Sequence, residues 1–193
     1  VTGAAFGRDG RFIVTSCEDG KIRFWQVGSY PHWGTVIRHE GPVNDAHFTH
    51  DGGALITGGQ DGFVKVSDLA TGQERFRPIW QRQPVGFVAL SNTGEKILAG
   101  ENPQRGLAVA GLWNGMTGTM LAEPIRQPRG YICGAFSPNE EYVVLGNTTG
   151  LVSVWRTNND LDPLVEYRHG GPVHSVCFDH SGTRIMSAGE DGA

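Results

Sequence analysis

The sequence contains no run of about 18 consecutive apolar residues, which argues against a membrane-spanning helix. At Val1 there is no basic flank followed by an apolar stretch, so we expect no secretory signal peptide. No cluster of Lys and Arg is present, and the 16 basic and 20 acidic side chains give a net charge of −4. This weakly acidic balance argues against nucleic acid and membrane surfaces as partners.

Cysteine is scarce in this sequence. Only Cys17, Cys133 and Cys177 occur, and none stands in a C-x-x-C pair, which argues against a zinc ribbon and a disulfide framework. We expect these residues to be small buried hydrophobic groups in a reducing compartment, which places the protein in the cytoplasm.

The motifs of common catalytic and nucleotide-binding sites are also missing. There is no G-x-S-x-G, no P-loop and no G-x-G-x-x-G. Acidic residues are scattered singly at turns, which gives no pair for general acid–base catalysis. His47 and His50 have loose metal-like spacing, but no third ligand is at hand. We therefore expect no enzyme activity, no cofactor and no metal site.

Glycine, in contrast, is abundant. The 29 glycines punctuate short runs rich in Val, Ile, Thr and Phe, a pattern that predicts short strands joined by tight turns.

An internal repeat of 42 to 46 residues runs through the chain. The apolar residues expected to open each first strand recur at steps of 42, 42, 46 and 42, at Val1, Val43, Val85, Tyr131 and Val173. The same steps separate Phe6, Phe48, Leu90, Phe136 and Phe178. The glycine of the following turn keeps the phase at positions 10, 52, 94 and 182, whereas Glu140 interrupts it. Three position classes in one phase indicate repeated structural units.

The second unit predicts the strand pattern of the others. We expect strands over 43–48, 54–58 and 63–67, and a fourth strand around 75–80. The segments 51–53 and 60–62 supply Asp-Gly turns, because glycine readily adopts the positive φ that a tight hairpin needs. Helical periodicity is absent, so each unit is predicted to be four short antiparallel strands.

These units resemble WD40 repeats, the blades of β-propellers whose period is about 40–45 residues. The matching segments are 19–25 and 149–155, which begin at a turn and end on Trp, together with 61–67, Arg38-His39, Arg168-His169 and the Thr-Gly turns at 71–72 and 117–118. The resemblance implies an all-β fold over residues 1–193: a partial WD40 β-propeller of about four and a half four-stranded antiparallel blades. Its repeats would start near residues 1, 43, 85, 131 and 173. The motifs are similar to those of bacterial WD40 arrays, which often stand beside protein-kinase domains.

The resemblance also bears on completeness. Because Val1 would open a strand and residue 193 falls in a turn, we expect a fragment of a larger ring, since an unclosed propeller leaves unpaired sheet edges. A self-contained four-bladed ring is the alternative.

In the WD40 family, a His before the first strand, a Ser or Thr on the second, the turn Asp and the Trp that closes the third form a hydrogen-bonded tetrad. Such polar groups must satisfy one another when they lie between packed strands. The resemblance assigns His39, Thr57 and Asp61 in the second unit, His169, Ser187 and Asp191 in the fifth, and Thr15, Asp19 and Trp25 in the first. A catalytic or metal-binding role for His39 or His169 is the rival interpretation.

The tetrad pattern is incomplete elsewhere. Ser67 replaces the Trp of the second unit, Gln81 and Gln127 replace His in the third and fourth, and the turn Asp is absent from both. We expect Trp113 and Trp155 of those units to remain as packing residues. The third unit is four residues longer, and we place the extra residues in a projecting loop over 101–106.

In this fold, the connections from fourth to first strands and the turns from second to third strands lie on one face, around the mouth of the central channel. We expect this rim to bind protein or peptide partners, because its charges are mixed in sign. The candidate residues are Glu18, Glu40, Asn44, Gln60, Arg82, Asn102, Gln104, Arg105, Arg129, His174 and Glu190, with the loop over 101–106 as the leading candidate. Trp80 is interpreted as a strand-packing aromatic, with an exposed anchor as the alternative.

The sequence therefore predicts a non-enzymatic protein–protein interaction scaffold. The alternative is a sensory or substrate-docking propeller within a larger bacterial Ser/Thr protein kinase or another multidomain enzyme. A propeller hydrolase is a third hypothesis, which would need clustered acids or metal ligands at the channel mouth.

Overall fold

In the computed structural model, the residues described are 1, 3–6, 10, 12–27, 37–102, 106–158 and 163–192. Within these ranges the chain forms 18 β-strands and no helix. The strands make four four-stranded sheets and one two-stranded sheet, and each sheet is built from consecutive antiparallel strands. This arrangement confirms the expected all-β fold of successive four-stranded blades.

The strand bounds follow the repeats of the sequence. Blade 1 contains β1 (Gly3–Phe6), β2 (Phe12–Ser16), β3 (Lys21–Gln26) and β4 (Ile37–Arg38). Blade 2 contains β5 (Val43–Phe48), β6 (Ala54–Gly59), β7 (Phe63–Asp68) and β8 (Ile79–Trp80). Blade 3 contains β9 (Val85–Leu90), β10 (Lys96–Glu101), β11 (Leu107–Asn114) and β12 (Ile125–Pro128). Blade 4 contains β13 (Tyr131–Phe136), β14 (Tyr142–Asn147), β15 (Leu151–Arg156) and β16 (Val165–Arg168), and blade 5 contains β17 (Val173–Phe178) and β18 (Ile185–Gly189).

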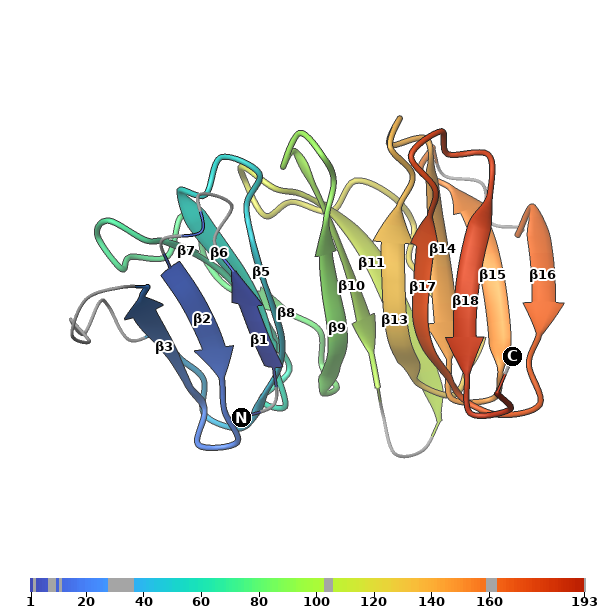
Figure 1. The fold of residues 1–193 in the computed structure, drawn as a ribbon, viewed down its shortest axis with the longest axis horizontal. Coiled ribbons are helices and arrows are strands. Elements are labelled where there is room, and N and C mark those ends of the chain that lie inside the picture. Colours follow the sequence, from blue (N-terminus) through green and yellow to red (C-terminus); the bar gives the residue numbers. More distant parts are fainter. Residues whose placement is uncertain are drawn as a thin grey trace.

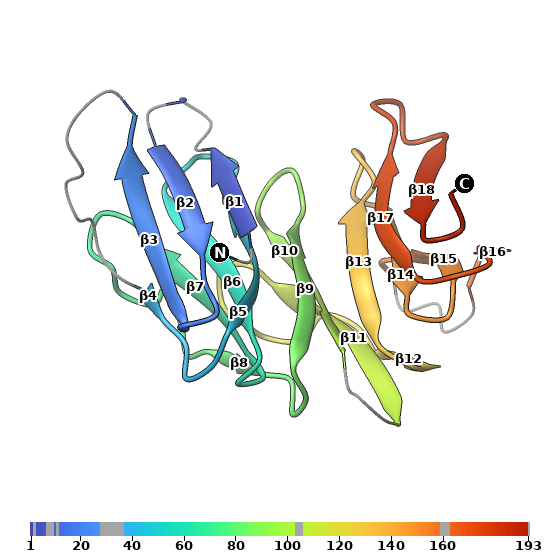
Figure 2. The same ribbon diagram turned by 60° about the horizontal axis from the view of Figure 1, so that its bottom comes forward.

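The blades stand side by side in chain order along an arc, with the N-terminal blade at one end and the C-terminal blade at the other (Figure 1). The first strand of each blade lies next to the first strand of the following blade, so that β5, β9, β13 and β17 line the inner side of the arc. Figure 2 turns forward the end of the blades at which these first strands begin. Equivalent residues of successive repeats therefore meet at one end of the molecule.

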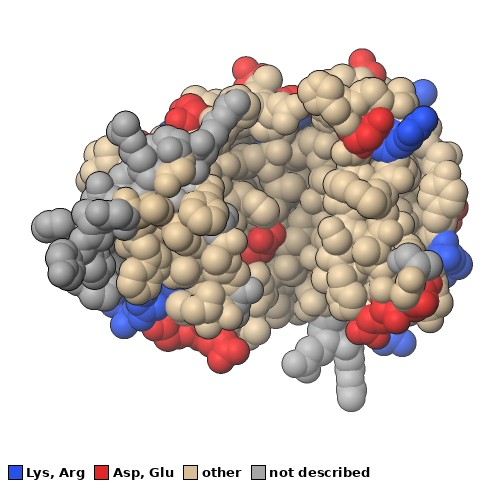
Figure 3. All heavy atoms as spheres, in the orientation of Figure 1, with Lys and Arg blue, Asp and Glu red and all other residues tan. Residues whose placement is uncertain are grey.

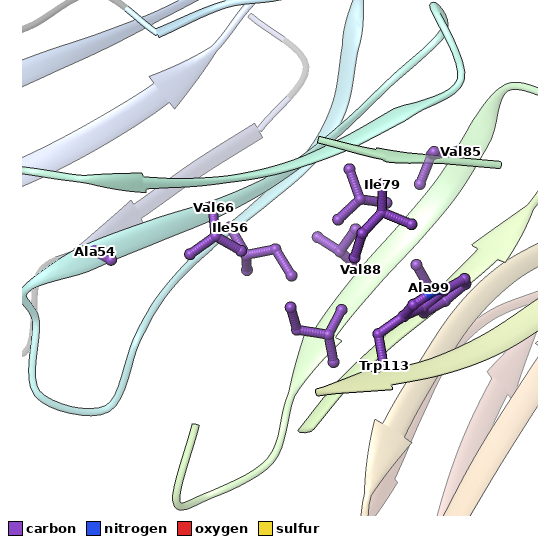
Figure 4. Packing of buried hydrophobic residues seen from close by; sticks show 10 residues of the cluster. Ala54, Ile56, Val66, Ile79, Val85, Val88, Ala99 and Trp113 are labelled. Atoms are coloured by element: carbon purple, nitrogen blue, oxygen red, sulfur yellow. The ribbon is translucent and has the colours of Figure 1, made fainter. Parts of the chain in front are cut away.

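The hydrophobic core is divided into layers between consecutive blades. Between blades 2 and 3, Ile56, Val66 and Ile79 pack against Val88 and Trp113 (Figure 4). Similar clusters join blade 1 to blade 2, blade 3 to blade 4 and blade 4 to blade 5. A central strand such as β6 faces two neighbouring blades, and all of its residues are buried. Burial on both faces explains why apolar residues follow one another in β6, β10 and β14.

The turn between first and second strands has a left-handed residue in every repeat. Its φ angles lie between 67° and 74° at Gly10, Gly52, Gly94 and Gly182. Glu140, which interrupts the glycine pattern of the sequence, keeps the left-handed backbone, with φ 59°. Its carboxylate accepts hydrogen bonds from the amide and the hydroxyl of Thr93 in blade 3, at 2.7 and 3.2 Å. These bonds offset the strained backbone and join two blades.

Some strand bounds differ from those expected. β8 begins at Ile79 and not near Arg75, and upstream of it only an isolated bridge joins Ser67 to Glu74. Val1 precedes β1, which begins at Gly3. Glu101 is buried as the last residue of β10, so it is not part of a projecting loop. A short segment at the outer edge of a blade has few neighbours to hold it in a strand, whereas Glu101 has a hydrogen-bond partner inside the blade.

Candidate functional site

The connections that precede the first strands and the turns between second and third strands lie together at one end of the blades, the lower edge in Figure 1; we call this end the rim. In blades 2 to 5 one backbone hydrogen bond of 2.8–3.0 Å joins the two segments. The donors are the amides of Gln60, Asn102, Thr148 and Glu190, and the acceptors are the carbonyls of Pro42, Pro84, Gly130 and Pro172. The rim is therefore an ordered, repeated surface.

Beneath the rim of blade 2, His39 joins the two segments with its side chain. Its Nδ1 lies 2.9 Å from the Asp61 carboxylate and its Nε2 lies 2.8 Å from the Thr57 hydroxyl. Burial lowers the pKa of His39, so the ring is neutral near pH 7. Because a carboxylate only accepts, Nδ1 carries the proton and donates to Asp61, and Nε2 accepts from Thr57. Asp61 also accepts the amide of Glu40 at 2.9 Å.

Blade 5 repeats this geometry with a more exposed set. The Nδ1 of His169 lies 3.0 Å from Asp191, and its Nε2 lies 2.8 Å from the hydroxyl of Ser187. The side chain of Asp191 is 24% exposed, against 8% for Asp61. The structure thus brings together the three residues assigned in each of these two blades.

In blade 1 the assigned residues divide into two pairs. The indole Nε1 of Trp25 donates to the Thr15 hydroxyl at 2.9 Å. Asp19 instead receives the guanidinium of Arg23 at 2.6 Å, which lowers the pKa of the carboxyl to about 2. Asp19 therefore remains ionised throughout the physiological range.

Blades 3 and 4 lack the turn Asp. Two residues that the sequence motifs did not reveal supply the side-chain oxygen that accepts a hydrogen bond from an amide of the third strand. The buried Glu101 carboxylate accepts the amide of Val109 at 3.0 Å. The side-chain oxygen of Asn147 accepts the amide of Leu151 at 3.0 Å and the amide of Thr149 at 2.9 Å. Both acceptors stand at the end of the second strand and not in the turn that follows it.

The third strand thus begins with the same kind of hydrogen bond in blades 1 to 4. Its first or third amide donates to a side-chain oxygen at 3.0–3.1 Å, although the acceptor residue changes from blade to blade. The donor and acceptor pairs are Lys21 with Asp19, Phe63 with Asp61, Val109 with Glu101, and Leu151 with Asn147. What the repeats retain is an oxygen at one place, not a residue type.

The last residue of the second strand is Gly in blades 2 and 5, which have the tetrad His, and Glu or Asn in blades 3 and 4, which lack it. The space at this position explains why one blade cannot hold both the His and the larger residue. A Cβ on Gly59 would collide with the His39 ring, and a Cβ on Gly189 would come within 2.9 Å of Nδ1 of His169. Glu101 and Asn147 occupy the same positions in blades whose His is replaced by Gln. A blade therefore holds either a His with a Gly or a Gln with a larger polar residue.

Blade 4 builds a complete polar network from the substituted residues. The side chain of Asn147 donates to Oε1 of Gln127, and Nε2 of Gln127 donates to the Ser153 hydroxyl, both at 3.4 Å. The indole of Trp155 donates to the same hydroxyl at 2.9 Å. Trp155 is also buried in the layer between blades 3 and 4, which confirms its expected packing role. In blade 3 the side-chain Nε2 of Gln81 donates to the backbone carbonyl of Ala99 at 3.3 Å.

The candidate rim residues fall into three groups. Those that are exposed are Glu18, Glu40, Gln60, Arg82, Arg129, His174 and Glu190. Two are partly buried: Asn44 donates from its side chain to the carbonyl of Val85 at 2.7 Å, and Asn102 packs against Gly130 of the next connection. Gln104 and Arg105 lie outside the described residues. The rim therefore presents side chains of both charges, and Asn44 and Asn102 hold neighbouring blades together.

A β-bulge recurs where each first strand leaves the rim. The register shifts once near the start of β5, β9, β13 and β17, which leaves one unpaired residue in each. These residues are Asn44, Gly86, Ile132 and His174. A bulge turns a side chain away from its normal strand direction and is common beside binding sites. The His174 ring reaches Glu190 across the rim at 3.2 Å.

Trp80 departs from its assigned packing role. It lies on the outermost strand of blade 2 and is 63% exposed, between the buried residues Ile79 and Gln81. The interpretation as a strand-packing aromatic was wrong, because an edge strand of two residues leaves one of its faces to solvent. Arg82 follows Gln81 and has a left-handed backbone, with φ 68°. Arg129 in the next connection shares this conformation, with φ 84°.

A cleft of about 670 Å³ lies on the inner side of the arc, lined by residues of β5, β9, β13 and β17. Figure 3 shows this face hollowed in its middle, where most of the surface is uncharged. Asp45 lies 3.1 Å from His47 in the cleft and raises the pKa of that imidazole. Burial raises the pKa of the Cys133 thiol to about 12, so Cys133 remains protonated.

Metal ligands do not cluster in the described part of the chain. No three side chains of His, Cys, Asp or Glu gather there in a way that could hold a metal ion. No helix in the same ranges has the length and apolar character needed to cross a bilayer.

Comparison with known proteins identifies the repeat. The family model described as "WD domain, G-beta repeat" (WD40) matches residues 1–26, 33–68 and 162–193. These are the three repeats that retain tetrad residues, whereas blades 3 and 4 carry the substituted networks.

Relatives support the same assignment over the whole chain. The Target of rapamycin complex subunit wat1 of Schizosaccharomyces pombe is 26% identical over 87% of this chain and 54% of its own length. The Periodic tryptophan protein 2 homolog of Dictyostelium discoideum is 24% identical over 97% of this chain and 20% of its own length. The Eukaryotic translation initiation factor 3 subunit I of Taeniopygia guttata is 23% identical over 100% of this chain and 49% of its own length. The chain thus spans about half or less of the length of these relatives. In its repeats, its four-stranded blades and these matches, the chain is similar to the WD40 repeat family.

Proposed function

We propose that this chain is a non-catalytic interaction platform that holds protein or peptide partners on its rim. The observation that carries the proposal is the construction of the rim: exposed side chains of both charges stand on turns and connections that backbone hydrogen bonds and the His–Asp pairs of blades 2 and 5 hold in place. A backbone that is already ordered loses little conformational freedom on binding, which favours affinity.

The names of relatives support the same role. The relative from Schizosaccharomyces pombe is called a complex subunit, and the one from Taeniopygia guttata is called a subunit of a translation initiation factor. Membership of an assembly is what a platform of this kind would provide. No observation favours the alternative of a docking part within a larger bacterial kinase.

A crosslinking pull-down with two matched sets of substitutions tests the proposal. The rim set is Gln60→Ala, Arg82→Glu and Glu190→Lys. The control set is His180→Ala, Arg184→Glu and Glu95→Lys, in the turns between first and second strands at the opposite end of the blades. Both sets alter exposed side chains, and thermal unfolding checks that each variant folds.

We expect the rim set to lose partners that the wild-type chain and the control set both capture. If partners are retained by the rim set and lost by the control set, the binding surface lies at the end of the blades opposite the rim, and the proposal is wrong. Equal capture by all three proteins would contradict the proposal.

A further inference from the structure

This inference rests on the proposed function and concerns the kind of partner that the surface between the edge of blade 2 and the entry to blade 4 accepts. The segment from Ile79 to Arg82 alternates between buried and exposed side chains. Ile79 and Gln81 are 7% and 4% exposed, whereas Trp80 is 63% exposed and Arg82 is also exposed. An indole and a guanidinium therefore project into solvent within three residues of each other.

Further positive charge gathers around Arg82. Arg82 and Arg126 both lie close enough to the buried Glu101 carboxylate to interact with it through charge. Arg129 stands on the next connection, where its amide donates to the carbonyl of Gly106 at 3.3 Å. Within the described ranges, no ion pair of 4.0 Å or less joins any of these three guanidinium groups to an acidic side chain. All three guanidinium groups are exposed, whereas the Glu101 carboxylate is buried.

The backbone at this place is strained. Arg82 and Arg129 adopt positive φ, which disfavours any residue with a Cβ, whereas Glu40 and Gly170, the counterparts of Arg82 in blades 2 and 5, do not. Strained residues of this kind cluster at binding sites, because the surrounding structure must hold them in place. Both arginines therefore stand on backbone that the surrounding connections must hold in place.

We propose that Trp80, Arg82, Arg126 and Arg129 form a docking epitope for a carboxylate-rich peptide segment of a partner protein. Arg binds carboxylates through two parallel hydrogen bonds, and Trp and Arg are the residue types that dominate binding energy at interfaces. An apolar side chain of the segment covers the indole of Trp80. The acidic residues Glu18, Glu40 and Glu190 stand elsewhere on the rim and repel such a segment, which favours the stretch from Trp80 at the edge of blade 2 to Arg129 at the entry to blade 4.

Selection from a library of random displayed peptides, with the purified full chain as bait, tests this epitope although the partner is unidentified. The selected peptides are labelled and their affinity is measured by fluorescence anisotropy. The variants are Trp80→Ala and a triple change of Arg82, Arg126 and Arg129 to Glu. A second triple change of the same residues to Gln covers the case in which charge reversal prevents folding. Arg184→Glu, at the opposite end of the blades, is the control.

We expect peptides enriched in Asp and Glu that also contain an aromatic or aliphatic residue. Their affinity should fall about tenfold or more in each triple variant and in Trp80→Ala, and remain unchanged in Arg184→Glu. Binding should also weaken as salt is raised, because the contacts are between exposed charges.

Two outcomes would overturn the epitope, and they differ in what they say of the platform. If the selected peptides are neutral or basic, or if they bind the triple variants as well as the wild type, the epitope is wrong and the platform stands. If no peptide is enriched and the crosslinking pull-down also captures no rim-dependent partner, both proposals fail.

Discussion

The Glu101 carboxylate holds the amide of Val109 at 3.0 Å, and one blade earlier Asp61 holds the amide of Phe63 at 3.1 Å. One acceptor ends a strand and the other sits in a turn, yet both place an oxygen at the start of the third strand. The equivalence of these two bonds makes the energetics of the substituted blades testable.

Replacing Glu101 by Ala should destabilise the fold by about 1–3 kcal/mol, because the amide of Val109 would lose its partner inside the blade. Urea unfolding followed by circular dichroism measures the loss. Glu95→Ala, an exposed acid in the same blade, is the control and should change stability by less than about 0.5 kcal/mol. A midpoint unaltered by Glu101→Ala would show that the bond contributes nothing.

Asp61→Ala and Asp191→Ala should each destabilise the chain by roughly 1–3 kcal/mol, since each change strands a histidine and nearby amides. The loss should be larger for Asp61, whose side chain is 8% exposed against 24% for Asp191. The same denaturant assay compares the two. Equal midpoints for both variants and the wild type would count against the tetrads.

Gly59→Asn should destabilise blade 2, because its side chain collides with His39. Adding His39→Gln and Asp61→Thr to it reproduces the residues of blade 4 and removes the collision. The triple variant should therefore lose at least about 1 kcal/mol less than the sum of the three single changes, measured by chemical denaturation. Strict additivity would mean that the two arrangements do not exclude each other.

Acidification should weaken the fold through His39. Burial lowers the pKa of His39, so the unfolded chain takes up a proton near the ordinary value of 6.5 while the folded chain does not. The stability contribution is thus present above pH 6.5 and is lost as the pH falls below it. Between about pH 7.5 and 5, the wild type should lose more unfolding free energy than His39→Gln does.

The Asp61 carboxyl adds to this loss only at lower pH. Burial would raise its pKa, but hydrogen bonds from His39, Glu40 and Phe63 outweigh burial and hold the pKa below 3.8. Parallel pH profiles of the wild type and His39→Gln above pH 5 would contradict the assignment of a neutral, buried His39.

Tyr131→Phe should raise stability by up to about 1 kcal/mol. Tyr131 is fully buried between blades 3 and 4, and its hydroxyl has no hydrogen-bond partner among the described residues. Removing a buried hydroxyl of this kind removes its desolvation cost and leaves the ring packing intact. Thermal unfolding measures the change, and a lower midpoint for Tyr131→Phe would point to a partner for the hydroxyl.

The blades could be predicted from the sequence because their period is set by burial. Val43, Val85, Tyr131 and Val173 recur in phase since each opens a first strand whose side chain enters the layer between two blades. Burial at one place in every repeat leaves little freedom in residue type. The phase is therefore visible before any contact between blades is known.

The substituted networks could not be predicted in the same way. A motif comparison does not find Glu101 and Asn147, because it compares each position of the motif separately. In the structure, the shared feature is a side-chain oxygen near the start of the third strand, which residues at different positions can supply. The signal is present as a coupled exchange, in which Gly59 and Asp61 change together. The prediction for Trp80 was wrong for a different reason: a strand pattern does not reveal that β8 is an outermost strand of two residues.

The recurrent bulge gives blades 2 to 5 one residue each that has no pairing partner on the neighbouring strand. Asn, Gly, Ile and His occupy that place, and the register on either side is the same in all four blades. Two of these residues are tied to a neighbouring blade, because Asn44 donates to the carbonyl of Val85 and a Cβ on Gly86 would collide with the carbonyl of Tyr131. One backbone feature therefore serves two ends: it joins blades in one repeat and, at His174, exposes a side chain to solvent in another.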